Sequence, residues 1–247
     1  MIIYMLVITW NILSKEWLNR GDFKERDKGY LRNKYREGKI KRILKRYKYD
    51  IMMLQEVDRE SYKFVGKELG SDYWISKLMV IKWEEDINKK TGNVIMVRRS
   101  KIKGEVIKER RVELGGGKRV LLVSYGDRVY INLHLTLKSS KLRMDHVRYI
   151  MDKLDKEYKG YRVVMGGDFN NDIMLDKRMH KYILKGGYKS VLRRMRPTYI
   201  HEGVMIDNIY ERGYKKREGW VYDEWNGRDK DFKNLGSDHY PVISRIG

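Results

Sequence analysis

The sequence of 247 residues contains no cysteine. Without cysteine the chain can form no disulfide and no thiolate zinc site, and it has no cysteine nucleophile. A disulfide-linked partner is excluded for the same reason. Any metal ion that this chain binds must therefore have oxygen or imidazole ligands.

Alanine is also absent, and glutamine, proline, threonine and histidine number one, two, four and five. Ordinary domains have alanine among their commonest residues. The codons of these five amino acids all need cytosine at the first or second position, so we infer a gene whose coding strand is poor in cytosine. The twelve residues of these types that are present are therefore more informative than usual.

No apolar run reaches the roughly 20 residues that a membrane-spanning helix needs. The apolar start, residues 1–13, lacks the positively charged region and the small-residue cleavage site of a signal peptide. We interpret it as a buried first strand. We expect a soluble, intracellular protein without membrane insertion.

Lysine and arginine number 55 against 34 acidic residues, which gives a formal net charge of +21. The basic residues are spread over residues 24–48, 98–111, 177–196 and 212–218. This charge favours a polyanionic partner, because cations that neutralise phosphates release counterions. Nucleic acid is the partner that we expect. The alternative is a set of solvated basic faces that reflect the composition of the gene.

The sequence has no internal repeat, proline-rich linker or low-complexity tail, so we predict a single domain over residues 1–247. Hydrophobic periodicity predicts helices over about 34–48, 139–157 and 174–185, with a short helix around 62–69. The predicted strands are 2–10, 50–54, 73–81, 93–98, 103–112, 119–125, 129–135, 162–165, 205–210, 219–222 and 240–245. Hairpins combined with strand–helix units predict an α/β fold of two packed sheets flanked by helices. No Gly-x-Gly-x-x-Gly motif favours a Rossmann sheet.

Polar residues recur where the predicted buried strands end. Carboxylates are poor packing groups at such positions, but they suit a hard cation that prefers oxygen ligands. The six strings are Thr9-Trp10-Asn11, Leu54-Gln55-Glu56-Val57, Asn132-Leu133-His134-Leu135, Gly167-Asp168-Phe169-Asn170, Met205-Ile206-Asp207-Asn208-Ile209 and Ser237-Asp238-His239-Tyr240-Pro241. They hold five of the twelve residues of the rare types.

These six strings, in this order, resemble the endonuclease/exonuclease/phosphatase superfamily, the group of deoxyribonuclease I and exonuclease III. The resemblance runs from Thr9 to Pro241, nearly the whole chain. Each string alone is weak, but six in the right order form a specific signal. The resemblance implies a four-layer α/β/β/α sandwich with two packed mixed β-sheets. It also implies hydrolysis of phosphoesters.

The resemblance implies a site for Mg²⁺ or Mn²⁺. Glu56 is expected to be the main ligand, with Asn11 beside it fixing a ligand water or the phosphate. Asp238 is expected to be a ligand at a second metal position. Magnesium keeps several waters and needs only one or two carboxylates, which agrees with so small a set.

The resemblance also implies the catalytic roles. His239 is expected to act as general base or phosphate stabiliser, with Asp207 holding its tautomer. Asp168 and Asn170 are expected to orient the attacking water and a phosphate oxygen. His134 is expected to donate to the phosphate oxygen that gains charge in the transition state.

Each of these residues also has a purely structural interpretation. Asn11 and Asn170 fit turns, and Asp168 fits an Asx-turn or a helix cap after the glycines. Asp238 fits a turn cap beside His239. The structural interpretation would be preferred for any one residue, but it requires six coincidences for the whole set.

His134 stands where abasic-site endonucleases have a tyrosine motif, so it resembles the deoxyribonuclease I, sphingomyelinase and deadenylase branches. Residues 39–57 most resemble the deadenylase and 2′,5′-phosphodiesterase branch. Aromatic and basic residues interleave in the predicted loops, where aromatics could stack on bases and cations could follow phosphates. The candidates for substrate contact are Trp17, Tyr35, Arg36 and Trp225.

The sequence thus predicts a divalent-metal-dependent phosphodiesterase that hydrolyses nucleic acid, with RNA slightly favoured over DNA, acting as a monomer. Three alternatives stay open. They are a DNA-repair type endonuclease or exonuclease, an inositol-phosphate or phospholipid phosphatase on the same scaffold, and a non-catalytic nucleic-acid-binding protein.

Overall fold

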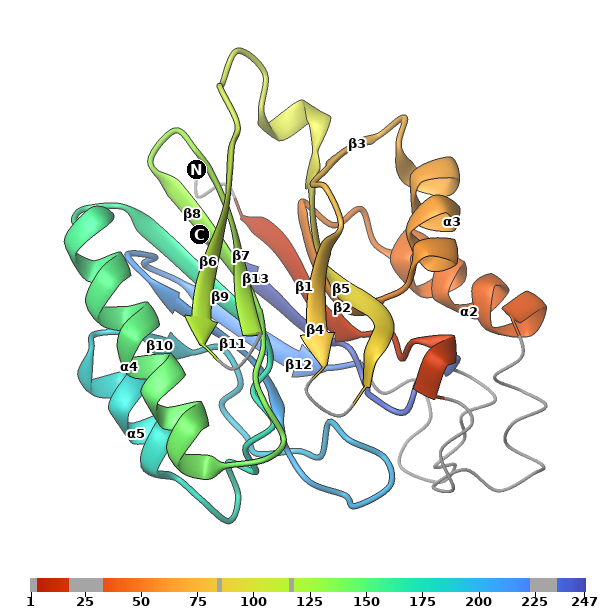
Figure 1. The fold of residues 1–247 in the computed structure, drawn as a ribbon. Coiled ribbons are helices and arrows are strands. Elements are labelled where there is room, and N and C mark those ends of the chain that lie inside the picture. The colour runs from red at the N-terminus through yellow and green to blue at the C-terminus, as the bar shows by residue number, and fades with distance from the viewer. Residues whose placement is uncertain (1–3, 18–32, 84–85, 116–117, 223–234) are drawn as a thin grey trace.

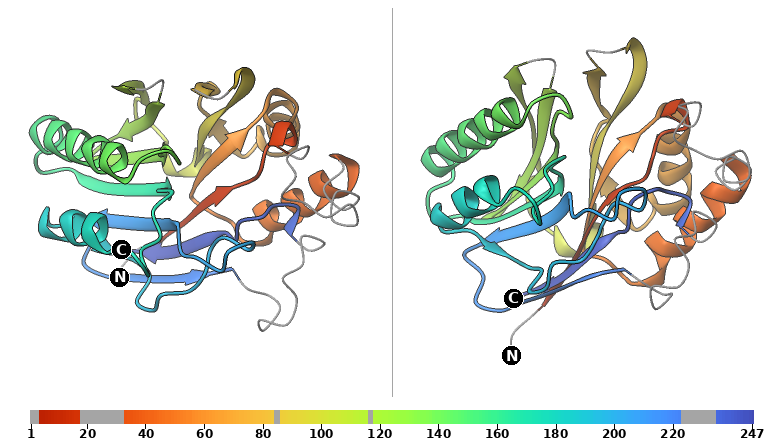
Figure 2. Two further views of the ribbon diagram at one scale, coloured as in Figure 1. Left: turned by 60° about the horizontal axis from the view of Figure 1, so that its bottom comes forward. Right: turned by 90° about the horizontal axis from the view of Figure 1, so that it is seen from below.

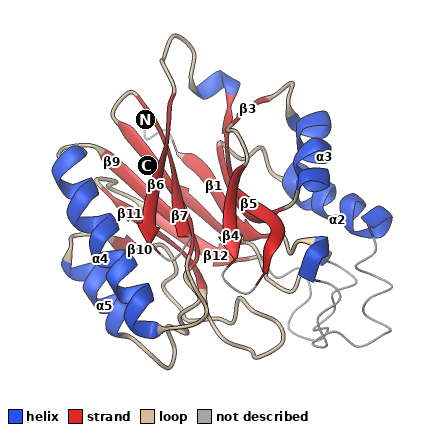
Figure 3. Cartoon of the chain, viewed as in Figure 1, coloured by secondary structure: helices blue, strands red, loops and turns tan. Residues whose placement is uncertain are grey.

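A computed structural model describes residues 4–17, 33–83, 86–115, 118–222 and 235–247. These residues form two β-sheets packed face to face, with helices on both outer faces (Figure 1). Helices and strands separate into four layers when coloured by type (Figure 3). The α/β/β/α sandwich expected from the sequence is therefore confirmed.

The first sheet has the strand order β12-β13-β1-β2-β5-β3, with β4 paired to β5. In it, β1 and β2 are parallel and the remaining pairs are antiparallel. Its strands are β1 (Met5–Asn11), β2 (Ile51–Val57), β3 (Tyr73–Ile75), β4 (Met79–Trp83), β5 (Asp86–Arg98), β12 (Arg217–Val221) and β13 (Val242–Ile246).

The second sheet has the strand order β10-β11-β9-β8-β7-β6, and in it β8 and β9 are the parallel pair. Both sheets are therefore mixed. Its strands are β6 (Lys108–Gly115), β7 (Lys118–Tyr125), β8 (Arg128–His134), β9 (Arg162–Asp168), β10 (Lys189–Ser190) and β11 (Asp207–Arg212).

Helices α2 (Asn33–Arg46) and α3 (Arg59–Leu69) cover the outer face of the first sheet, and α4 (Ser140–Glu157) and α5 (Arg178–Lys185) cover that of the second (Figures 1 and 2). The short 3-10 helices η1 (Lys15–Trp17) and η2 (Arg99–Lys101) complete the described elements. No helix in these ranges is both long enough and apolar enough to cross a membrane.

Alternating side chains of the central strands produce this layering. In β1, Ile8 and Trp10 pack toward α2 and α3, whereas Val7 packs between the sheets. In β2, Met52 joins the first of these clusters and Met53 the second. Strands buried on both faces read as continuous apolar runs, which is why the sequence predicts them readily.

Four predicted elements differ from the structure, and the first is the strand predicted over 93–98, which begins at Asp86 as β5. The strand predicted over 73–81 is divided into β3 and β4, with Ser76 between them bonding to Ile95 of β5 through N–H and Oγ. The strand predicted over 103–112 begins only at Lys108, because a turn with Gly104 at φ +75° precedes it. The helix predicted over 174–185 begins at Arg178, where the Asp176 carboxylate accepts the Arg178 N–H.

The carboxyl ends of β1, β2, β8 and β9 meet at one edge of the sandwich. Asn11 is in register with Gln55 across β1 and β2, and His134 is in register with Asp168 across β8 and β9. Asp207, the first residue of β11, is opposite Asp168. The strand ends that carry the six sequence strings therefore converge at this edge.

Close packing just below this edge explains the two glycines before Asp168. A Cβ at Gly166 would lie 2.4 Å from the Cε of Met53 in the other sheet, and one at Gly167 would lie 2.0 Å from the Leu133 carbonyl oxygen. A buried hydrogen bond of 2.7 Å from Gln55 Nε2 to Asn132 Oδ1 also joins the two sheets here. This packing brings the polar strand ends of the two sheets together.

Candidate active site

A pocket of about 380 Å³ opens at the edge where the strand ends converge. The structure brings six of the eight residues predicted to be catalytic or metal-binding into its lining. They are Glu56, His134, Asp168, Asn170, Asp238 and His239. Asn11 and Asp207 lie behind this lining and contact it by hydrogen bonds. All eight residues therefore belong to one site.

The Asn11 amide is the centre of the site. Its Nδ2 lies 3.1 Å from Glu56 Oε1, 3.1 Å from Asp168 Oδ2 and 3.4 Å from His239 Nε2. Its Oδ1 accepts the Leu13 N–H at 3.1 Å, which fixes the orientation of the amide. Asn11 is 1% exposed, so it acts by positioning these groups from beneath the pocket.

Glu56 stands at a β-bulge, where the register of β2 against β5 shifts between Leu54 and Val57. The bulge turns its carboxylate toward the end of β1, where Oε2 accepts the Ser14 N–H at 3.1 Å. Burial and the nearby Asp238 carboxylate raise the pKa of Glu56 above its usual value. A cation beside Glu56 would relieve both effects.

Three non-glycine residues of the described chain have left-handed backbone conformations. They are Leu13 at φ 55°, Glu56 at φ 54° and Asn170 at φ 49°, and all three line the pocket. Such conformations are strained for residues with a Cβ and cluster at functional sites. The backbone itself thus marks this pocket as a functional site.

His239 and Asp207 form a buried pair, with His239 Nδ1 2.8 Å from Asp207 Oδ2. The Trp10 indole N–H donates to the His239 carbonyl at 2.9 Å, and the Tyr199 ring packs 5.0 Å from the imidazole, centroid to centroid. Burial lowers the pKa of His239. The carboxylates of Asp207, Asp238 and Asp168 outweigh burial and raise this pKa well above its usual value. The imidazole is held in one orientation with Nε2 toward the pocket.

His134 and Asp168 form the opposite wall, with His134 Nε2 3.5 Å from Asp168 Oδ2. The Asn170 N–H donates to Asp168 Oδ1 at 2.8 Å, and the Asn170 side-chain amide donates to the Leu135 carbonyl at 2.8 Å. Burial and the Asp207 charge raise the pKa of Asp168 to about 7. Burial, with Lys118 and His239 nearby, lowers the pKa of His134 well below its usual value. A neutral His134 can still donate one N–H.

The donor set fits a hard divalent cation. Among the described residues, Asp238 Oδ1 and Asp207 Oδ1 are buried without a hydrogen-bond partner. Burial raises the pKa of Asp238, as it does for Glu56 and Asp168. Ligand atoms of Asp168, Asp207 and His239 also lie within 4.8 Å of one another. Buried carboxylates in this number require compensation by positive charge, and oxygen donors are those that Mg²⁺ prefers.

The candidates for substrate contact have different outcomes. Trp17 lines the pocket, while Tyr35 is 67% exposed on α2 and does not line it. Arg36 is 1% exposed, so the prediction that it contacts substrate is wrong. It shares the buried face of α2 with Ile40 and donates to Ser61 Oγ of α3 at 3.3 Å. Trp225 lies outside the described residues.

Sequence reasoning missed Thr198 and Tyr199. The Thr198 Oγ accepts the N–H groups of Ile206 and Asp207 at 3.0 and 2.9 Å, which fixes the start of β11. Tyr199 lines the pocket and packs on His239. Thr198 is one of only four threonines, so the scarcity of this residue was a signal that could have indicated it.

The sequence model of the Endonuclease/Exonuclease/phosphatase family matches residues 8–239. A comparison with curated protein sequences gives no match. The residues matched by the family model begin within β1 and end at His239, so they include the whole of the site described above.

Several solved structures share this fold. ANGEL2, a 2′,3′-cyclic phosphatase in complex with adenosine-2′,3′-vanadate, has a TM-score of 0.75 at 14% identity, covering 99% of this chain and 95% of that chain. The mannosyl-6-phosphatase Bt3783 of Bacteroides thetaiotaomicron has a TM-score of 0.71 at 16% identity, and the match covers 98% of this chain and 99% of that chain. TDP2 of Caenorhabditis elegans has a TM-score of 0.68 at 18% identity, and the match covers 99% of this chain and 74% of that chain. At these identities the likeness shows the fold, which is the sandwich of deoxyribonuclease I.

Proposed function

This chain belongs to the endonuclease/exonuclease/phosphatase family of phosphoester hydrolases, and on that premise we propose that it is a divalent-metal-dependent phosphodiesterase acting on nucleic acid. RNA is the favoured substrate over DNA. The reaction is hydrolysis by in-line attack of water on phosphorus.

One observation carries this proposal. A single buried amide, that of Asn11, lies within 3.4 Å of Glu56, Asp168 and His239, so it ties a candidate metal ligand to both walls of the pocket. Hydrolysis of a phosphodiester needs a cation, a proton acceptor and a donor to the phosphate around one phosphorus atom. The pocket offers all three kinds of group.

Glu56 and Asp238 are the residues that would hold the metal ion, and Asn11 orients the Glu56 carboxylate through its Nδ2. When bound, Mg²⁺ or Mn²⁺ would supply positive charge that stabilises the phosphate oxygens in the transition state. The elevated pKa values of Glu56 and Asp238 support this assignment, because they reflect buried negative charge that a bound cation would offset.

His239 and Asp207 are proposed to manage the proton. Asp207 Oδ2 accepts from His239 Nδ1 at 2.8 Å, which leaves Nε2 facing the pocket. There it either takes a proton from water or, as the raised pKa of His239 favours, carries a proton and stabilises the phosphate. The positive charge that then forms on the ring is stabilised by Asp207, as in other histidine–carboxylate pairs.

His134, Asp168 and Asn170 are proposed to hold the phosphate and the attacking water. A neutral His134 donates its N–H to a phosphate oxygen that gains charge in the transition state. Asp168 accepts from the water, and its 2.8 Å bond from the Asn170 N–H fixes the direction in which it does so.

A polymeric substrate is supported by the net charge of +21, which exceeds what a small phosphate ester requires. ANGEL2, which shares the fold, is a 2′,3′-cyclic phosphatase with an adenosine ligand, and this likeness supports RNA. Bt3783 acts on a sugar phosphate, so a phosphomonoesterase is the second candidate.

The test uses 5′-labelled single-stranded RNA, single-stranded DNA and abasic duplex DNA, each with Mg²⁺ or with EDTA, and mannose 6-phosphate in parallel. We expect a Mg²⁺-dependent ladder on RNA that Glu56→Gln and His239→Ala abolish. Glu113→Gln is the matched control, because this carboxylate is 63% exposed and pairs with Arg119 on another surface.

Phosphate release from mannose 6-phosphate without strand cleavage would overturn the proposal in favour of the phosphatase. Cleavage confined to the abasic site would assign the chain to the DNA-repair alternative. Binding of nucleic acid without hydrolysis of any substrate would favour the non-catalytic alternative.

A further inference from the structure

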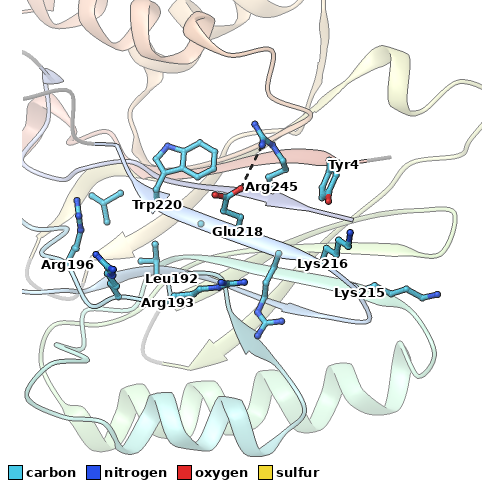
Figure 4. A pocket seen from close by; sticks show the side chains of 13 residues that line it. Tyr4, Leu192, Arg193, Arg196, Lys215, Lys216, Glu218, Trp220 and Arg245 are labelled. Carbon is cyan, nitrogen blue, oxygen red and sulfur yellow. Dashed lines mark ion pairs between the residues drawn. The ribbon is translucent and has the colours of Figure 1, made fainter. Parts of the chain in front are cut away.

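A second and larger pocket, of about 760 Å³, lies between β12, an edge strand of the first sheet, and the segment that follows β10, an edge strand of the second sheet (Figure 4). We call it the basic groove, defined by residues 192–194 and 196 on one wall, residues 215–221 on the other, and Tyr4 and Arg245. None of these residues lines the candidate active site.

The groove is strongly cationic. Its 13 lining residues include a single acidic side chain, Glu218, which pairs with Arg245 at 3.8 Å. Arg217 is held by the Glu211 carboxylate at 3.6 Å and by the Ser190 carbonyl at 3.2 Å. Five further cations are exposed and form no ion pair with any described residue: Arg193, Arg194, Arg196, Lys215 and Lys216. So much unneutralised charge in one concave surface fits a polyanion.

Two aromatic side chains accompany these cations. Trp220 is half-buried and lies beside Glu218, and Tyr4, which is 41% exposed, lies toward the end that carries Lys216 (Figure 4). Aromatic faces between cations are the arrangement by which proteins bind single strands, since bases stack on the rings while the cations contact phosphates. A duplex keeps its bases stacked on one another, so these two rings favour a single strand.

Both walls of the groove continue directly to the candidate active site. Arg196 is two residues before Thr198, whose Oγ holds the Asp207 N–H. On the other wall, the residue after Val221 donates its N–H to the Pro241 carbonyl at 2.7 Å, and Pro241 is two residues from His239. The chain segments that form the two walls therefore lead directly into segments that hold the site, which places the groove beside the pocket.

We propose that the basic groove binds a single-stranded nucleic acid, as a site for the nucleotides that flank the phosphate in the candidate active site. Its role toward a cleaved strand rests on the proposed function, whereas binding itself does not. The five residues of β12 span about 17 Å, so the groove has room for a short run of nucleotides.

The experiment measures binding of fluorescein-labelled single-stranded RNA of 3, 6 and 12 nucleotides by fluorescence anisotropy. EDTA is present throughout, so no cleavage is required for a result. The groove variants are Lys215→Glu with Lys216→Glu, and Arg193→Glu with Arg194→Glu. The matched control is Lys156→Glu with Lys159→Glu, two exposed lysines at the end of α4 and beyond it, which changes the net charge equally.

We expect each pair of groove substitutions to weaken binding of the 12-nucleotide strand at least about tenfold and the control pair less than about twofold. The slope of log K against log salt should become about 1.4 units less steep in each groove pair, for two lost phosphate contacts on a single strand. Affinity in the unaltered chain should rise from 3 to 6 nucleotides. The conservative pair Arg193→Lys with Arg194→Lys should retain binding.

Equal losses in the groove and control pairs would overturn the proposal, because net charge alone would then explain binding. Binding by the groove pairs equal to that of the unaltered chain would also overturn it. The proposed hydrolysis is measured separately with Mg²⁺, so a chain that binds strands through the groove and cleaves none would refute the proposed function while leaving the groove supported.

Discussion

His239 and Asp207 are 32 residues apart in the sequence, and the fold places His239 Nδ1 2.8 Å from Asp207 Oδ2 at the base of the pocket. Asp207 begins β11 in one sheet, and His239 precedes β13 in the other. The pair therefore forms only when the two sheets pack against each other.

Replacing Asp207 by asparagine removes the carboxylate and keeps the shape of the side chain. We expect kcat for the proposed hydrolysis to fall about 10²–10⁴-fold, because the His239 ring loses the acceptor that fixes its tautomer. KM should change little, since Asp207 lies behind the pocket lining. Steady-state kinetics on the preferred strand check both values. Asp176→Asn, which removes an equal charge beside Arg178 on the surface, should retain activity. A rise in KM together with the fall in kcat for Asp207→Asn would contradict a role confined to His239.

The effect of Glu56→Gln on the stability of the fold should depend on whether Mg²⁺ is bound. In EDTA the variant should be at least as stable as the unaltered chain, because burial and Asp238 make the Glu56 charge unfavourable. With Mg²⁺ at about 100 times its Kd, the unaltered chain should gain about 2.7 kcal/mol, or about 5–10 °C in Tm, and the variant far less. Thermal unfolding followed by circular dichroism measures both conditions. An equal gain in both proteins would show that Glu56 does not hold the ion.

Gly167→Ala should destabilise the fold by about 3 kcal/mol or more. Gly167 has φ +148°, and a Cβ there would lie 2.0 Å from the Leu133 carbonyl oxygen in the neighbouring strand. Gly187→Ala is the control, because Gly187 also has positive φ, at +82°, but open space around the Cβ position. The control should cost about 1–2 kcal/mol from backbone strain alone. Urea unfolding of both variants measures these losses of stability, provided that the m-value stays constant. The difference between the two variants gives the contribution of steric overlap beyond backbone strain.

Glu211→Gln should stabilise the protein increasingly as the pH rises from about 4 to 7, through and above the usual carboxyl pKa. Glu211 is fully buried in β11, and burial raises its pKa despite the Tyr214 N–H and the Arg217 guanidinium. The unfolded chain therefore loses this proton at lower pH than the folded chain does, and stability decreases as the pH rises. The measurement is the difference in Tm between variant and unaltered chain at several pH values.

Asp127→Asn provides a control of opposite sign. The Arg162 guanidinium, 2.7 Å away, lowers the pKa of Asp127, so this carboxylate stabilises the fold above its usual pKa and loses the effect as the pH falls. Its destabilisation should therefore be largest near pH 7 and vanish in acid. The same pH trend in both variants would contradict the assigned causes.

The sequence by itself determined the layers of the fold and the membership of the site. Strands such as β1 and β2 are buried on both faces, so their apolar runs are readable without knowledge of their neighbours. Glu56 and Asp168 end such strands, and a charged group at the end of a buried strand has few structural reasons to be there. Residues singled out by their position at the end of a strand were therefore predicted to share one site, and the structure brings them together there.

Only the tertiary structure decided which side chains meet. The Asn11 amide contacts Asp168 across 157 residues, a relation that no local pattern contains. Arg36 was wrongly predicted to contact substrate because a charged residue is usually exposed. In the structure it lies on the buried face of α2 and donates to Ser61 of α3. The basic groove is built from residues 192–194 and 196, which follow β10, and from residues 215–221, which include β12. The strands β10 and β12 are edge strands of different sheets. Sheet packing, which depends on contacts between distant segments, creates these arrangements, and the sequence order of the residues does not reveal them.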